Sequence, residues 1–93
     1  MAPNHVLVVD DERAVRVALD VNLSKAGYIV SLADNAERAL DALRTQSVDL
    51  VLTDLMMPGM DGMELLEQIR ERWPETQVIM MTGHGTVERA VEA

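Results

Sequence analysis

Three aspartates and one threonine follow directly on short apolar stretches of this 93-residue chain. They lie at the ends of three such stretches: Asp10 and Asp11 after residues 5–9, Asp54 at the end of 48–54, and Thr82 at the end of 77–82. Short runs rich in Val, Ile and Leu are typical of strands in a parallel sheet that is buried on both faces. Because ligands bind at the carboxyl ends of such strands, these four residues are candidates for a functional site.

The candidate residues offer oxygen ligands and one possible nucleophile. Three carboxylates in one small pocket repel one another unless a cation lies among them, and hard oxygen ligands suit Mg²⁺ best. The main-chain carbonyl of Met56, just after Asp54, offers a further oxygen. Asp54 could itself be a nucleophile, since carboxylates form acyl phosphates and a metal offsets the incoming charge. Simpler roles stay open: Asp10 and Asp11 as helix N-caps, and Asp54 as a turn former.

The elements that must position these residues alternate in type along the chain. Strands are expected at residues 5–9, 28–33, 48–54 and 77–82. Helices are expected to begin near residues 12, 34, 61 and 86, where apolar residues recur at helical spacing. Asp34 with Glu37 is typical of a capping box at the second helix. Strand and helix alternate four times, which indicates an α/β fold with a parallel sheet covered on both faces.

Two strand orders fit this alternation, 3-2-1-4 of a Rossmann half and the flavodoxin-like 2-1-3-4. The Rossmann order normally carries Gly-x-Gly-x-x-Gly after the first strand, but residues 10–13 read Asp-Asp-Glu-Arg. Carboxylates there would repel a dinucleotide phosphate, so we expect the flavodoxin-like three-layer sandwich. That order places the first and third strands side by side. It therefore predicts that Asp10, Asp11 and Asp54 converge, with Thr82 on the same sheet edge.

The composition excludes several other functions. The formal net charge is −8, which argues against binding to nucleic acid or to an anionic membrane, since both attract Lys and Arg. There is no cysteine, which excludes a disulfide framework and thiolate chemistry. No apolar run approaches the roughly 20 residues of a membrane span, and residues 1–4 do not open a signal peptide.

Three segments together resemble the receiver domain of two-component response regulators. They read Val-Leu-Val-Val-Asp-Asp-Glu at 6–12, Asp-Leu-Val-Leu-Thr-Asp-Leu-Met-Met-Pro-Gly-Met-Asp-Gly at 49–62, and Val-Ile-Met-Met-Thr-Gly at 78–83. The resemblance covers essentially the whole chain, residues 1–93, as one domain. It implies that Asp54 is a phosphoacceptor that takes its phosphoryl group from the phosphohistidine of a sensor kinase.

The same resemblance assigns roles to the remaining candidates. It implies that Asp11, Asp54 and the Met56 carbonyl bind Mg²⁺, with Asp10 acting largely through water. Thr82 would be the hydroxyl that moves to the phosphoryl group, and Gly83 would leave that group accessible. The family also implies a cytoplasmic signalling protein that accepts phosphate without being a turnover enzyme.

Residues 82–93 further resemble receivers of the nitrogen-regulator type. Those receivers precede an ATPase domain that activates transcription with an alternative sigma factor. The resemblance therefore implies an effector domain in the native chain, such as an ATPase with a DNA-binding domain, and no nucleic-acid contact by this segment.

The chain departs from the family at its end. Family receivers have five strands and five helices, whereas residues 86–93 are expected to begin a fourth helix and supply no fifth strand or fifth helix. The family lysine of the fifth strand has no counterpart, since Lys25 is the only lysine. We expect a shortened receiver whose strand at 77–82 has an unpaired apolar edge, which predicts homo-oligomers.

Two alternatives to a phosphoacceptor stay open. One is a receiver-like interaction module that takes no phosphate, which the missing lysine favours and the three aspartates disfavour. The other is a Mg²⁺-dependent phosphatase with Asp54 as nucleophile. Phosphatases of the haloacid-dehalogenase type place a second aspartate two residues after the nucleophile, where this chain has Met56, which cannot transfer a proton.

Overall fold

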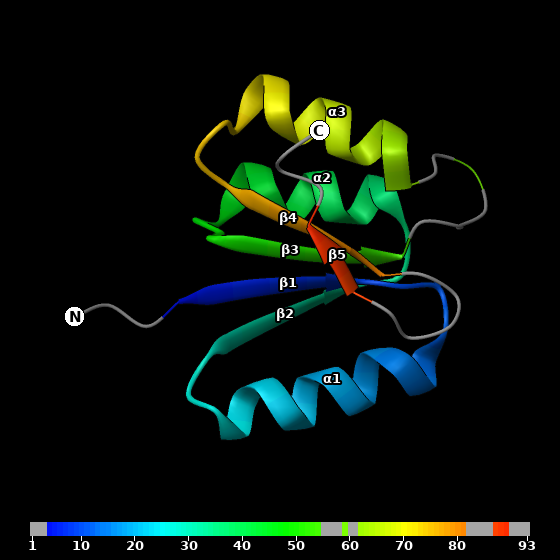
Figure 1. Cartoon of the computed structure of the whole chain (residues 1–93), viewed down its shortest axis with the longest axis vertical. Helices are drawn as coiled ribbons and strands as arrows, with labels where there is room; N and C mark the ends of the chain where they lie inside the picture. The colour runs from blue at the N-terminus through cyan, green and yellow to red at the C-terminus, as the bar shows by residue number, and fades with distance from the viewer. Residues whose placement is uncertain (1–3, 55–58, 60–61, 82–86, 90–93) are drawn as a thin grey trace.

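The four segments that were expected to be strands do form parallel strands. The computed structural model describes residues 4–54, 59, 62–81 and 87–89. The parallel strands are β1 (His5–Val9), β2 (Ile29–Ala33), β3 (Leu50–Asp54) and β4 (Gln77–Met81). They lie in the order β2-β1-β3-β4, which confirms the predicted flavodoxin-like sheet. The order leaves β1 and β3 side by side at the centre (Figure 1).

Three helices cover the sheet, α1 (Arg13–Lys25) on one face, and α2 (Ala36–Thr45) and α3 (Gly62–Arg72) on the other (Figure 1). Side chains alternate along β1 because successive residues of a strand point to opposite faces. Leu7 and Val9 join the core beneath α2 and α3, whereas Val6 and Val8 join the core beneath α1. All four are fully buried, so β1 is covered on both faces as its apolar sequence predicts. Among the described residues, no helix is long and apolar enough to cross a membrane.

The helix ends follow local sequence. Gly27 has a φ of 101°, a conformation that glycine adopts without steric cost, and Tyr28 N donates to Leu23 O at 3.1 Å, as in a Schellman motif. The N-cap of α2 is Asn35, whose Oδ1 accepts a hydrogen bond from Arg38 N at 2.8 Å. The predicted capping box on Asp34 is therefore wrong by one residue, because the adjacent asparagine supplies the capping oxygen.

The expected fourth helix is not found at residues 87–89, which form a short strand instead. This strand, β5 (Val87–Arg89), pairs antiparallel with β4, with Met81 opposite Val87. The prediction of a sheet without a fifth strand is thus corrected, although β5 is not the parallel strand of the family. The physical reason is that pairing satisfies open backbone groups of β4 at residues 79–81, a gain that a helix at residues 87–89 would not make. Residues 79–81 of β4 are therefore not the bare edge on which the predicted homo-oligomer was based.

Candidate functional site

The register of β1 against β3 brings two of the candidate aspartates together. Val9 lies opposite Thr53, so the next residue of each strand, Asp10 and Asp54, lies at the same edge of the sheet. Both strands are parallel, which places this edge at their carboxyl ends. The location is the one where open α/β sheets bind ligands.

Asp10 is held firmly where β1 ends. Its side chain is 5% exposed, its backbone N donates to Ala33 O at 3.1 Å, and its Oδ1 accepts from Glu12 N at 2.8 Å. The N-cap of α1 is Glu12, which makes no capping bond with its side chain. The alternative role of Asp10 and Asp11 as N-caps is therefore not what the structure shows. Asp10 instead closes the turn that leads from the sheet into the helix.

The three aspartates form one acidic cluster. One carboxylate oxygen from each of Asp10, Asp11 and Asp54 lies within 4.8 Å of the others. Asp10 is buried, Asp54 is half-buried and Asp11 is exposed, so the cluster opens to solvent on one side. The predicted convergence of these three residues is confirmed as geometry.

The surroundings of Asp10 disfavour the ionisation of its carboxyl group. Burial raises the pKa of Asp10 above its usual 3.8, the Glu12 backbone N–H opposes this, and the neighbouring charges of Asp54, Asp11 and Glu12 raise it further. A cation between the carboxylates would relieve both the desolvation and the repulsion. Three hard oxygen donors in this arrangement fit Mg²⁺, which prefers carboxylate ligands and keeps several waters. The donor set therefore matches the predicted ion.

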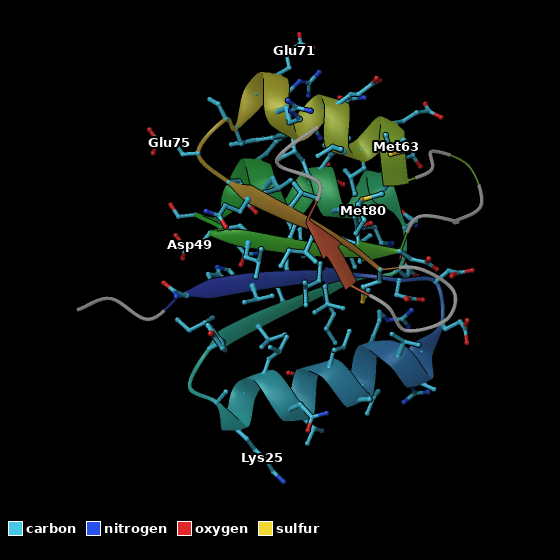
Figure 2. The ribbon with its side chains drawn as sticks, in the orientation of Figure 1. Lys25, Asp49, Met63, Glu71, Glu75 and Met80 are labelled. Carbon is cyan, nitrogen blue, oxygen red and sulfur yellow. The ribbon has the colours of Figure 1, made fainter. Side chains whose placement is uncertain are left out.

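Other predicted site residues fall outside the described part of the chain. Met56, Thr82 and Gly83 are among them, so the structure does not test their positions. Gly59, between Asp54 and α3, is described and has a φ of 78°, a conformation that glycine adopts readily in turns. Lys25 lies at the end of α1 and points into solvent at the opposite end of the sheet from the cluster (Figure 2).

Sequence reasoning missed one residue beside the cluster. Arg16 is half-buried in α1, and its Nη1 donates to the carbonyl oxygen of Asp10 at 2.7 Å. The available signal was its position, six residues after Asp10 and on the flank of the stripe formed by Leu19 and Leu23. An arginine there faces the sheet edge rather than open solvent.

The comparisons with known proteins identify the class. A family model described as the response regulator receiver domain matches residues 6–93. The chain therefore belongs to the receiver domain family of response regulators. It is 48% identical over 88 residues to the response regulator protein FleR of Pseudomonas aeruginosa, covering 95% of this chain and 19% of that protein. It is 42% identical over 86 residues to the transcriptional regulator NtrC of Klebsiella pneumoniae, covering 92% and 18%.

These matches also bear on the subgroup and on length. The resemblance to nitrogen-regulator receivers is confirmed by NtrC, and the chain spans about a fifth of the length of FleR and NtrC. Among solved structures, the response regulator TrrA of Thermotoga maritima in complex with Mg²⁺-BeF is similar, with a TM-score of 0.81 and 36% identity. That match covers 87% of this chain and 72% of the other, and it supports the flavodoxin-like fold.

Proposed function

We propose that residues 1–93 act as a phosphoacceptor unit of a two-component system, with Asp54 accepting a phosphoryl group from a sensor histidine kinase. One observation carries the proposal: the carboxylates of Asp10, Asp11 and Asp54 converge within 4.8 Å at the carboxyl ends of β1 and β3. This convergence occurs in a chain of the receiver family. An acidic cluster of this kind can hold a cation and present a nucleophilic oxygen beside it.

The cation we assign to the cluster is Mg²⁺. Asp11 and Asp54 would bind it directly, Asp10 largely through water, and the Met56 carbonyl would supply a further oxygen. When bound, the ion offsets negative charge on the transferred group. The Mg²⁺ in the related Thermotoga maritima structure supports this choice of ion.

The chemistry falls to the side chain of Asp54. One of its carboxylate oxygens attacks the phosphorus of the phosphohistidine, so a P–O bond forms, the P–N bond breaks, and the imidazole leaves with the electron pair. The half-buried position of Asp54 at the strand end leaves room for this approach. Thr82 would then donate its hydroxyl proton in a hydrogen bond to a phosphoryl oxygen, and Gly83 would leave access open.

The output of this step lies in other parts of a longer protein. FleR and NtrC are regulators about five times the length of this chain, and NtrC is described as binding DNA. We propose that an effector domain for transcription, such as an ATPase with a DNA-binding domain, responds to the state of Asp54. In energetic terms the phosphoryl group shifts a two-state equilibrium of the receiver surface.

The test is intact mass after incubation with Mg²⁺ and acetyl phosphate. The expected result is a hydroxylamine-labile phosphoryl adduct in the chain that disappears in Asp54→Asn. Asp49→Asn is the matched control. Asp49 lies just before the first residue of β3, at the other end of the strand from Asp54, so this variant should form the same adduct as the wild-type chain. An adduct that persists in Asp54→Asn would contradict the assignment, and release of product from a phosphate ester would favour the phosphatase.

One observation keeps the interaction module as a second candidate. Lys25, the only lysine, points away from the cluster, so no lysine of this chain pairs with a phosphoryl group on Asp54 (Figure 2). Mg²⁺ binding without any adduct would support this candidate. Repeating the reaction on a chain extended through a lysine-bearing strand separates the outcomes, because a regained adduct restores the phosphoacceptor.

A further inference from the structure

Arg16 is tied to the acidic cluster through the main chain. Its Nη1 donates to the carbonyl oxygen of Asp10 at 2.7 Å, a distance at the short end of the range for a charged donor. The bond links the first turns of α1 to Asp10, the first residue after β1. Arg16 is half-buried, so this contact is partly screened from water.

Three hydrogen bonds thus fix Asp10. Its backbone N is bonded to Ala33 of β2, its Oδ1 to the backbone N of Glu12, and its carbonyl oxygen to Arg16 of α1. The Glu12 bond closes the turn that contains Asp11, and the Arg16 bond is the one made to the oxygen of the Asp10–Asp11 peptide itself. Without it, the carbonyl oxygen of that peptide would lose the charged donor that fixes its direction.

The choice of the carbonyl as partner has a consequence for metal binding. An arginine paired with a carboxylate would neutralise it and compete with a cation for the same oxygens. Bonded to the carbonyl, Arg16 brings a permanent positive charge near three carboxylates while leaving their oxygens to the ion. The arrangement restrains the backbone that carries Asp10 and Asp11 without occupying their carboxylates.

We propose that Arg16 is a positioning residue that holds the Asp10–Asp11 turn in the conformation that binds Mg²⁺. This inference rests on the proposed function, because it takes the cluster as the metal site. Groups that orient metal ligands typically change metal affinity by 10–100-fold when removed. Arg16 is such a group, acting on the backbone that carries two of the three carboxylates.

The test is a Mg²⁺ titration followed by backbone amide chemical shifts, which report the fold and the site in one spectrum. Arg16→Met, which keeps the length and loses the donors, should raise the half-saturating Mg²⁺ concentration by roughly ten-fold or more. Arg13→Met is the matched control: Arg13 is exposed at the start of the same helix, so the charge change is identical. It should shift the midpoint less than about two-fold. Arg16→Lys should fall between wild type and Arg16→Met, because an ammonium keeps the charge and loses the planar fork.

Several outcomes would overturn the proposal. An unchanged midpoint in Arg16→Met removes the positioning role and leaves the metal site standing, as do equal losses in Arg16→Met and Arg13→Met. Absence of any Mg²⁺ response in the wild-type chain overturns the metal site and the positioning role together. If Arg16→Met gives no folded spectrum, Arg16→Lys decides: a several-fold weaker affinity supports the role, and a wild-type affinity overturns it.

Discussion

The two ends of the central strands are built on opposite principles. At the amino end, His5 Nδ1 donates to Ser47 O at 2.9 Å, its Nε2 lies 2.7 Å from Ser31 Oγ, and its backbone N donates to Asp49 Oδ2 at 2.8 Å. At the carboxyl end, one oxygen from each of three carboxylates lies within 4.8 Å of the others. The first end satisfies its polar groups, whereas the second brings like charges together.

The difference shows where the molecule places stability and where it places function. The hydrogen bonds of His5 at the amino end join β1, β2 and the segment before β3. A further bond joins the segments before β3 and β4: Thr76 Oγ1 donates to Val48 O at 2.9 Å. Figure 2 shows Asp49 and Glu75 at this end, away from the acidic cluster. At the carboxyl end the pKa of Asp10 is raised, chiefly by burial, so its charged form is disfavoured in the folded chain. Changes at the amino end should therefore lower the free energy of unfolding and leave Mg²⁺ binding unchanged. Removal of the Asp10 charge at the carboxyl end should raise the free energy of unfolding without Mg²⁺ and weaken Mg²⁺ binding.

The largest effect on folding is expected from His5→Leu. The substitution removes the ring contacts to Ser47 and Ser31 while keeping apolar volume, so the free energy of unfolding should fall by about 2 kcal/mol. Urea denaturation measures this change. The Mg²⁺ midpoint should stay within about two-fold, and a parallel loss of Mg²⁺ affinity would break the separation between the two ends.

A smaller effect of opposite sign is expected from Asp10→Asn. The folded state raises the pKa of Asp10 above 3.8, so it holds this proton more tightly than the unfolded chain does. The stability contribution is therefore present below pH 3.8 and is lost as pH rises through the higher folded pKa. Without Mg²⁺ at neutral pH, the variant should gain on the order of 1 kcal/mol in unfolding free energy.

Addition of Mg²⁺ provides a second test, because a ligand that binds the folded state stabilises that state more when it binds more tightly. Added Mg²⁺ should raise the unfolding midpoint of the wild-type chain more than that of Asp10→Asn. Thermal denaturation with and without Mg²⁺ measures both. A variant less stable than wild type without the ion would mean that the cluster is not repulsive.

The smallest effect is expected from Thr76→Val at the amino end. This nearly isosteric change removes the donor to the Val48 carbonyl and should cost about 0.5–1 kcal/mol of unfolding free energy. The Mg²⁺ midpoint should not move. A decrease in unfolding free energy larger than that of His5→Leu would show that the loop before β4 stabilises this end more than the His5 contacts do.

The sequence predicts the sheet well because the relevant signals are local. The acids at 10–12, where a Rossmann half has glycines, are sufficient to choose the strand order and hence the meeting of Asp10, Asp11 and Asp54. Residues 87–89 are different, because their state depends on the open edge of β4 and not on their own periodicity.

Contacts to the main chain escaped prediction for a related reason. Arg16 bonds a carbonyl oxygen and His5 bonds the carbonyl of Ser47, and every residue has such a carbonyl. The residue type of the acceptor therefore does not show, in the sequence, which carbonyl a side chain will bond. The N-cap of α2 was misplaced by one residue for a similar reason. The side chains of Asp34 and Asn35 can both accept the capping bond, and the backbone direction determines which of them does so.

The central place of β1 also has a consequence for how the chain is made. The ribosome synthesises β1 early, yet one of its two neighbours, β3, is formed by residues 50–54, and His5 meets Asp49 across 44 residues of sequence. Such distant pairing is slow, because a long loop must close before the contact is gained. During synthesis, one edge of β1 therefore stays unpaired until the residues of β3 have been made. Asp10 acquires its neighbour Asp54 only at that moment, so the pairing of β1 with β3 and the assembly of the acidic cluster are a single folding event.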